Sequence, residues 1–301
     1  MIGDDCAVIP KDDLVDTVIT SDLLVEGIDF RLEWTNPGFL GHKALAVSLS
    51  DVAAMGGSPK WAMLSIGIPE TLWKSEFLDK FYAGWHDLAA RHEIELIGGD
   101  ISRTPDKLVI DSIVLGEVPR GKAVMRSGAK PGDAIFVTGF LGGAAAGLKL
   151  LESGEKYSPS LPATTRHLLL RQLQPIPQVV TSKLLQEYSL PTAMIDISDG
   201  LSSDLHHLLE SSNVGCRVDI DRIPTDPAMA SLAKFSTAPI DLALHGGEDF
   251  ELIITVAPEN TLLAVDLGFH RIGDITGNAG IMEMVTGTSV TVMPPQGFRH
   301  F

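Results

Sequence analysis

Hydrophobic and polar positions alternate along the first third of the chain in a way that predicts strands and helices in turn. Residues 16–30 have the pattern of a strand, a turn and a second strand, and residues 37–56 have apolar positions at helical spacing. That helix should end at Gly56 and Gly57, just before Pro59. The first predicted unit is therefore a strand region followed by a helix.

The same kind of alternation continues as far as residue 118. It predicts strands at 61–69, 94–99 and 108–118, the second of them short and buried, and an amphipathic helix at 74–92. Strands and helices that alternate in this way favour one layered α/β domain. We therefore expect residues 1–118 to form an N-terminal domain.

A second domain is expected after a junction rich in glycine, proline and basic residues. Between Gly116 and Asp133 the sequence has no sustained apolar period, and we place the boundary near residue 119. Residues 119–301 then form a C-terminal α/β domain. Its predicted elements are strands at 134–139, 192–196 and from 250 onward, and helices at 142–153, 164–173, 176–188 and 199–212.

The composition fits a folded protein of one large domain or two ordinary ones. Of 301 residues, 45% are hydrophobic and 21% are charged, which excludes a disordered chain, a collagen and a coiled coil. The chain has 23 basic and 39 acidic residues, a net charge of −16. This charge argues against binding to nucleic acid or to a membrane surface, because both are anionic. A protein this acidic that handles phosphates should hold metal cations beside them.

The two cysteines, Cys6 and Cys216, lie far apart and have no CxxC partner, so we expect neither a disulfide framework nor a cysteine zinc site. This usage favours a reducing compartment. The N-terminus lacks the basic and apolar regions of a signal peptide, and no apolar run approaches the roughly 18 residues of a membrane span. We therefore expect a cytoplasmic protein.

Acidic residues gather beside glycine, serine and apolar runs at the ends of predicted strands. They are Asp4, Asp5, Asp22, Asp51, Asp100, Asp196 and Asp199. Each alone has an ordinary explanation, such as Asp5 in a turn, or Ser198 or Asp199 as the N-cap of the following helix. Strand ends are, however, also where mixed α/β folds bind their ligands.

Three of these acidic segments follow apolar runs, which predicts that their carboxylates are buried. The segments are TVITSD, IELIGGD and TAMIDISD. An isolated buried carboxylate is costly, and several in one cleft repel each other unless a hard cation neutralises them. Ligand sets made only of oxygen suit Mg²⁺. The sequence therefore predicts a magnesium site.

Glycine pairs could bring backbone N–H groups close to nucleotide phosphates. The candidates are Gly98-Gly99, Gly142-Gly143 and Gly246-Gly247. Residues 142–149 are not a Walker A loop, because Leu148 follows the second glycine where that motif has lysine. Protein-kinase motifs are absent as well. A nucleotide site here would belong to another class.

Four further polar side chains could contribute to chemistry. His245 and Glu248 could form an acid/base pair, although a lone histidine at a strand end is more often structural. Lys43 and Arg126 are candidate cations. Lys43 precedes Asp51 by eight residues, about two helical turns, but a solvent-exposed helix lysine would have the same pattern.

Several segments, in this order and spacing, resemble the thiamine-monophosphate kinase family. They are GDDCAVI, TSDLLVEGIDF, HKALAVSLSDVAAMGGSPKW, LIGGDISR, RSGAKPGDAIFVTGFLGGAAAGL, MIDISDGLSSDL and HGGEDFEL. The family belongs to the superfamily typified by aminoimidazole ribonucleotide synthetase. The resemblance covers almost the whole chain and implies an α/β (α+β) fold of two domains, with mixed sheets covered by helices, that binds ATP without a P-loop.

The resemblance also implies an activity: transfer of the γ-phosphoryl group of ATP to the phosphate of thiamine monophosphate, which gives thiamine diphosphate. Its Mg²⁺ ligands would be Asp5, Thr20, Ser21, Asp22, Asp51, Asp100, Asp196 and Asp199. ATP would contact Gly99, Asp100, Arg126 and Ser198, and the catalytic groups would be Asp100, Asp196 and Arg126. Asp29, Glu248 and Phe298 would line the substrate pocket. The family further implies a homodimer that pairs through its N-terminal domains.

Two features depart from the family pattern. Asp29 stands where the family usually has a histidine that touches the substrate, and a carboxylate there would repel the substrate phosphate unless it binds a cation or faces the cationic thiazolium ring. The chain also begins at the GDD motif, so we expect either a start codon assigned late or a protein without the family's N-terminal helical segment. Two alternatives stay open: another ATP-dependent synthetase of the superfamily, and a non-catalytic nucleotide-binding regulator.

Overall fold

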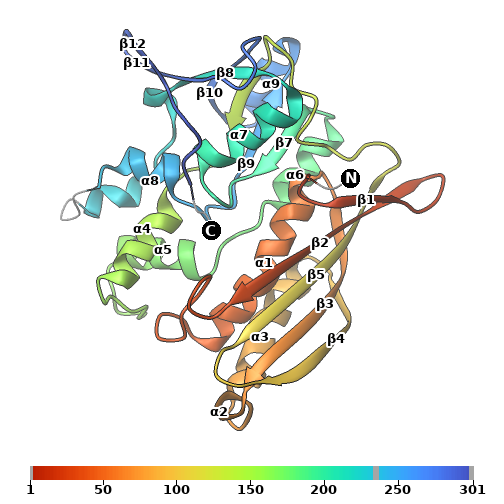
Figure 1. Ribbon diagram of the computed structural model, residues 1–301, viewed down its shortest axis with the longest axis vertical. Coiled ribbons are helices and arrows are strands. Elements are labelled where there is room, and N and C mark those ends of the chain that lie inside the picture. Colours follow the sequence, from red (N-terminus) through yellow and green to blue (C-terminus); the bar gives the residue numbers. More distant parts are fainter. Residues whose placement is uncertain (1–2, 233–236, 298–301) are drawn as a thin grey trace.

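The computed structural model describes residues 3–232 and 237–297, which form two sheets with helices packed against them (Figure 1). Within these residues the first sheet has five strands and the second has seven. The mixed α/β fold predicted from the sequence is confirmed. None of the helices in these two ranges is both long enough and apolar enough to cross a lipid bilayer.

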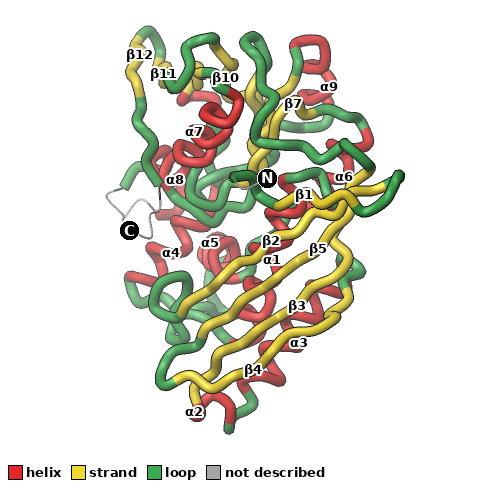
Figure 2. Tube along the Cα trace, turned by 45° about the vertical axis from the view of Figure 1, so that its right-hand side comes forward, coloured by secondary structure: helices red, strands yellow, loops and turns green. Residues whose placement is uncertain are grey.

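The first sheet comes from the N-terminal part of the chain and has helices on one face, which we call its inner face (Figure 2). Its strands, in order across the sheet, are β1 (Ala7–Pro10), β2 (Val15–Val25), β5 (Val109–Pro119), β3 (Ser58–Pro69) and β4 (Glu95–Thr104). Only the β3–β4 pair is parallel among these neighbours. Helices α1 (Pro37–Ala54) and α3 (Phe77–Arg91) cover the inner face, and the short α2 (Glu70–Trp73) precedes α3.

Helices α1 and α3 approach each other backbone to backbone at glycines. A Cβ atom on Gly41 would lie 1.9 Å from the carbonyl oxygen of Phe81, and one on Gly84 would lie 1.9 Å from that of Gly38. Only residues without a side chain fit at these crossing points. Because α3 packs so closely on one side and the sheet on the other, α1 is buried along most of its length, Lys43 included.

The second sheet is covered on both faces. Its strands, in order, are β12 (Ser289–Val292), β11 (Met282–Thr286), β8 (Gly215–Asp219), β10 (His270–Thr276), β6 (Ala134–Val137), β9 (Leu252–Val256) and β7 (Pro191–Asp196). Ile135 of β6 packs in one core with α7 (Leu201–Ser212) and α8 (Pro239–His245). Phe136, the next residue, packs in another with α6 (Val179–Glu187) and α9 (Thr261–Asp266). β6 is therefore buried at every position.

Helices α4 (Gly143–Glu152) and α5 (Ala163–Leu173) pack on each other and form a smaller core of their own. Short 3₁₀ turns occur at Ile220–Arg222, Pro227–Leu232 and Pro258–Asn260. The helices predicted from the sequence in both halves of the chain are confirmed, with ends that differ by a few residues. β1, β8, α8, α9 and the short α2 have no predicted counterpart, and α9 lies in the region where only strands were predicted.

Two strand predictions are wrong. Residues 16–30 do not form two strands, because the pairing of β2 with β5 continues without a break from Val15 to Val25 and the turn comes later, at Gly27 with φ of 94°. The strand predicted at 94–99 as short and buried is β4, which is longer and exposed along most of its length. It lies at the edge of the sheet, where one side of a strand has no neighbour.

Candidate functional site

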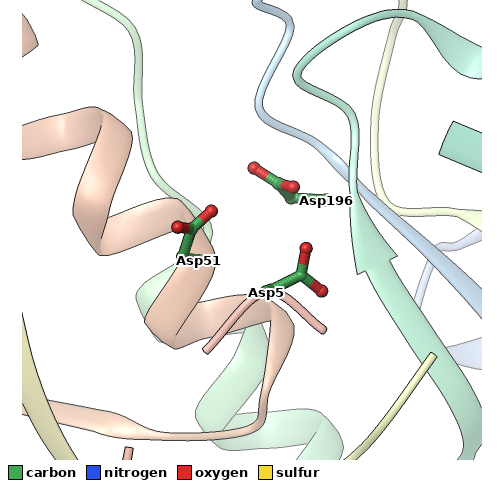
Figure 3. Close-up of side chains that lie close together, drawn as sticks. All are labelled: Asp5, Asp51 and Asp196. Carbon is green, nitrogen blue, oxygen red and sulfur yellow. The ribbon is translucent and has the colours of Figure 1, made fainter. Parts of the chain in front are cut away.

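Three carboxylates from distant parts of the sequence meet where the two sheets come together (Figure 3). Asp5 lies just before β1, Asp51 lies in the last turns of α1, and Asp196 is the last residue of β7. Each offers an oxygen within 4.8 Å of those of the other two. Asp5 and Asp196 are buried and Asp51 is half-buried. We call these three residues the carboxylate cluster.

Neighbouring side chains hold the carboxylate cluster in place without neutralising it. Thr20 donates a hydrogen bond to Asp51, and Ser50 Oγ donates one to Asp196 Oδ2 at 2.6 Å. Arg126 Nη2 donates to Asp5 Oδ1 at 2.6 Å. Within the described part of the chain, the buried Asp5 Oδ2 has no hydrogen-bond partner, so one oxygen of the cluster is left for a ligand.

Burial and mutual repulsion raise the pKa values of these groups. Burial raises the pKa of Asp196 to about 8, and the charge of Asp5 adds to this effect. Burial raises the pKa of Asp5 to about 6, although Arg126 opposes the change. The pKa of Asp51 is also raised, by burial and then by the charge of Asp22. A divalent cation would remove this repulsion, and the all-oxygen donor set with its unpartnered Asp5 oxygen fits Mg²⁺.

Asp22 lies close to this site, and Ser21 does not. Side chains alternate along β2, so Thr20 and Asp22 face α1, where Ser48 Oγ donates to Asp22 Oδ2 at 2.7 Å. Ser21 faces the outer side of the sheet and donates to Asp111 Oδ1 at 2.8 Å. The structure therefore brings together Asp5, Thr20, Asp22, Asp51 and Asp196 of the predicted metal ligands.

Asp100 and Gly99 lie on β4, apart from the carboxylate cluster. Asp100 is exposed and pairs with Ser65 of β3, on the same outer face as Ser21. Gly99 is needed for packing, because a Cβ atom there would lie 1.9 Å from the Leu64 carbonyl oxygen. The metal, nucleotide and catalytic roles suggested for these two residues stay predictions.

A cavity of about 540 Å³ adjoins the cluster and is lined by both halves of the chain. Its lining includes five predicted site residues, Asp22, Asp29, Ser198, Asp199 and Glu248. Aromatic and apolar side chains complete the walls, among them Phe30, Trp34, Leu40, Val47, Leu148 and Phe250. Phe298 lies outside the described residues, but its neighbour Gly297 also lines this cavity. We call this cavity the pocket.

Glu248 is held firmly at one end of the pocket. Its Oε1 lies 2.6 Å from Lys43 Nζ, and Gln172 donates to its other oxygen. Lys43 is buried, so the alternative of a solvent-exposed helix lysine is wrong. His245 also lines the pocket, but its Nδ1 pairs with Ser202 Oγ at 2.9 Å, so the structure shows no His245–Glu248 pair.

Asp29, Ser198 and Asp199 are positioned by turns. Asp29 Oδ2 accepts a hydrogen bond from the backbone N–H of Val25 at 2.8 Å, which closes the turn after β2. Asp204 accepts from the N–H groups of Asp199 and Gly200, both at 3.0 Å. The N-cap residue of α7 is Gly200, so the predicted N-cap role of Ser198 or Asp199 is wrong, and Asp204 in the first turn holds the segment before the helix.

Sequence reasoning missed the pocket residues that have no acidic or glycine-rich motif. Trp34 and Gln172 line the pocket from a loop and from α5, and nothing in their local sequence marks them. From α1, Ser48 donates to Asp22 and Ser50 donates to Asp196 of the carboxylate cluster, and their spacing to Asp51 is the only signal in the sequence. Contacts between the two halves of the chain create these roles.

Comparisons with known proteins agree with the resemblance seen in the sequence. The family models "AIR synthase related protein, N-terminal domain" and "AIR synthase related protein, C-terminal domain" match residues 3–118 and 130–281. The thiamine-monophosphate kinase of Salmonella typhimurium is 40% identical to this chain, and that of Bacillus subtilis is 35% identical. Both matches cover all of this chain, and they cover 91% of the first relative and 93% of the second.

A solved structure, AaThiL complexed with AMPPCP and TMP, matches with a TM-score of 0.89 and 32% identity over 100% of this chain and 92% of that one. The two-domain superfamily fold expected from the resemblance is therefore confirmed. This agreement in sequence and in fold extends over the full length, and the chain belongs to the thiamine-monophosphate kinase family of AIR synthase related proteins.

Proposed function

We propose that this chain transfers the γ-phosphoryl group of ATP to thiamine monophosphate, with Mg²⁺ bound at the carboxylate cluster. One observation carries the proposal: the carboxylate cluster keeps a buried oxygen without a partner among the described residues, and Asp22, whose charge acts on Asp51, lines the pocket together with Glu248 and aromatic side chains. The relative AaThiL was solved with AMPPCP and TMP, which supports ATP and thiamine monophosphate as the ligands of this chain.

The acceptor is already a phosphate, so the reaction needs no covalent enzyme intermediate. What it needs is in-line positioning of two anionic groups and neutralisation of their charge. Bound Mg²⁺ would supply that neutralisation. Asp5, Asp22, Asp51 and Asp196 would hold the ions, with Thr20, Asp100 and Asp199 as the further proposed ligands.

Arg126 is the basic side chain nearest the proposed phosphoryl path. Its guanidinium is anchored by Asp5 at 2.6 Å, and its backbone N–H donates to Asp4 Oδ1 at 3.1 Å. We propose that it contacts ATP and stabilises the transferring group. Gly99, Asp100 and Ser198 are the other proposed nucleotide contacts, and Asp100 and Asp196 the other proposed catalytic groups.

The pocket suits a cationic aromatic acceptor. Phe30 and Trp34 line the pocket together with Asp29 and Glu248, and the Trp34 ring already stacks with the Arg31 guanidinium at 4.7 Å. Aromatic and acidic side chains together attract a cationic heterocycle such as thiazolium. Asp29, fixed by the Val25 N–H, would then lie beside the ring of the substrate, and Phe298 stays the further proposed substrate contact. The thiamine phosphate group would extend toward Asp22 and the carboxylate cluster.

We also propose a cytoplasmic homodimer that pairs through the first sheet. Figure 2 shows no described helix over the outer face of that sheet, and Ile9 and Leu23 on its strands are 50% and 59% exposed. A second copy would cover this apolar surface. Asp100 and Ser21 lie on the same face. Two buried free cysteines support a reducing location.

The test is chromatographic detection of thiamine diphosphate made from thiamine monophosphate and ATP, with Mg²⁺ and with a chelator. We expect product only with the metal. Thermal stabilisation by ATP and Mg²⁺ without any product would refute the kinase and favour a regulator. ADP release that depends on a different acceptor would instead indicate another synthetase of the superfamily.

A further inference from the structure

A buried lysine contacts the pocket, and the phosphoryl transfer described above does not use it. The side chain of Lys43 is 5% exposed, and its Nζ lies 2.6 Å from Glu248 Oε1 and donates to the Gln172 carbonyl oxygen at 3.4 Å. Burying an ammonium group this deeply is costly unless it is paired. The role of Lys43 should therefore be sought in its ion pair with Glu248.

Glu248 is fixed by its backbone as well as by its carboxylate. Its φ of 67° is in the left-handed region that few residues other than glycine adopt, and its N–H donates to the Ser198 carbonyl oxygen at 2.8 Å. The preceding Gly247 has no room for a side chain, since a Cβ atom would lie 2.4 Å from that same oxygen. Backbone strain that the surroundings maintain in this way is typical of ligand sites.

The ammonium group of Lys43 compensates the charge of the Glu248 side chain where that side chain faces the pocket. The Glu248 side chain is 28% exposed, and three other carboxylates, Asp22, Asp29 and Asp199, line the same cavity. Without the ammonium group, Glu248 would be left uncompensated among like charges. The Glu248 side chain would then turn away from the pocket, and its acceptor oxygens would be lost to the ligand.

We propose that Lys43 is a positioning residue for acceptor specificity: its ion pair holds the Glu248 side chain directed at the cationic, amino-substituted aromatic part of the acceptor. This inference rests on the proposed function, because it names the end of thiamine monophosphate that Glu248 recognises. Lys43 contacts Glu248 and not the transferring phosphoryl group, so its effect should appear in acceptor binding and not in the chemical step.

The experiment compares steady-state kinetics of Lys43→Met, Lys43→Arg and the wild type with thiamine monophosphate and ATP varied separately. Lys43→Met removes a charged hydrogen bond to a partly buried carboxylate, so it should raise the KM for thiamine monophosphate at least about tenfold. The KM for ATP and kcat should change less than about threefold. Lys43→Arg should recover part of the affinity because it keeps the charge.

The matched control is Lys80→Met on α3. Lys80 pairs with Glu76 at 2.7 Å, but its side chain is 62% exposed, so this variant loses a Lys–Glu pair away from the pocket. All its kinetic constants should match the wild type. A wild type that makes no thiamine diphosphate would refute the proposed function, whereas an active wild type with an unchanged Lys43→Met variant would refute only the role of Lys43.

Two further outcomes would also overturn the inference. A fall in kcat with an unchanged KM for thiamine monophosphate would place Lys43 at the chemical step. If Lys43→Met does not fold, the double variant Lys43→Met/Glu248→Gln removes both charges together. Its KM for thiamine monophosphate should equal that of Glu248→Gln alone, because Lys43 acts through Glu248. A further large rise would show that Lys43 has an independent role.

Discussion

The molecule contains two buried acidic clusters that differ in how their charge is compensated. Asp249 accepts hydrogen bonds from the N–H groups of Gly142 and Ala144 at 2.6 and 3.1 Å, and Glu251 accepts one from Thr138 Oγ1 at 2.8 Å. Arg171 lies between the two carboxylates, 3.6 Å from Asp249 and 3.3 Å from Glu251. We call Asp249, Glu251 and Arg171 the structural cluster.

The carboxylate cluster of Asp5, Asp51 and Asp196 has no comparable set of partners. Arg126 pairs with one of its members, and Asp5 keeps a buried oxygen without a partner among the described residues. Burial raises the pKa of Asp5 and of Asp249 alike to about 6, but it raises that of Asp196 to about 8, so the contrast is carried by Asp196 and by the unpartnered Asp5 oxygen. A buried carboxylate that the protein itself compensates stabilises the fold, and one that it does not compensate is available to a ligand.

The largest effect is expected when an aspartate is replaced by asparagine, and we compare this substitution between the two clusters. The first variant is Asp196→Asn. We expect turnover to fall at least about a thousandfold, since a ligand of the proposed metal is lost. The melting temperature of the metal-free protein should stay the same or rise, because a source of repulsion is removed. Kinetics and thermal melts check both parts. An active variant would contradict the metal assignment.

Asp249→Asn should do the opposite. It weakens the acceptor for two backbone N–H groups and leaves Arg171 with one carboxylate fewer, which should lower the free energy of unfolding by about 3 kcal/mol. Chemical denaturation measures this loss. Folded enzyme below its melting temperature should keep kcat within about threefold of the wild type. If stability is unchanged but activity is lost, the two clusters do not differ in the way described here.

Addition of Mg²⁺ should distinguish the two clusters through metal binding, without any measurement of turnover. A cation at the carboxylate cluster stabilises the folded chain by about 2 to 3 kcal/mol at a hundredfold excess over its dissociation constant. We expect this gain in thermal melts of the wild type and of Asp249→Asn, and its loss in Asp196→Asn. Equal stabilisation of all three proteins would place the ion elsewhere.

The smallest effect should be the pH dependence of the metal-free protein. The pKa values of Asp5 and Asp196 are raised in the folded state, to about 6 and about 8, so the folded chain binds protons that the unfolded chain releases. Their contribution to stability is present below about pH 4 and is lost as the pH rises through these values. The melting temperature should fall between about pH 5 and pH 8, with a smaller slope in Asp196→Asn. A slope that the substitution leaves unchanged would show that other groups dominate.

The sequence predicted the fold class and most helices because apolar spacing records which face of an element is buried. It placed β4 wrongly inside the sheet, since the run before Asp100 is as apolar as a central strand and position across a sheet is not encoded locally. The turn at Asp22 was wrong for a related reason: serine and aspartate there resemble turn residues, yet ladder pairing with β5 continues through them.

Motifs that end a strand or mark a helix pointed to side chains that the structure brings together, whereas contacts between distant segments could not be predicted. Asp5, Asp51 and Asp196 were all expected at a metal site, and the structure brings their oxygens together. The separation of Ser21 from Thr20 follows from strand alternation, which family motifs do not express. Glu248 and Asp249 are neighbours in HGGEDFEL, and this segment alone does not show that their environments differ. The side chains that make the difference, Arg171, Gln172 and Lys43, come from other helices.

Helix α1 has a consequence for substrate choice that goes beyond its burial. Lys43 and Asp51 lie eight residues apart on it, which separates their Cα atoms by about 12 Å along the helix axis. Because α1 is clamped by α3 through glycine contacts on one side and by the first sheet on the other, this spacing cannot adjust to the ligand. With the roles proposed above, α1 fixes the distance between the acceptor-binding end of the pocket at Lys43 and the metal-binding end at Asp51. An acceptor that fits the pocket chemically but is too short to span this distance should bind without reacting.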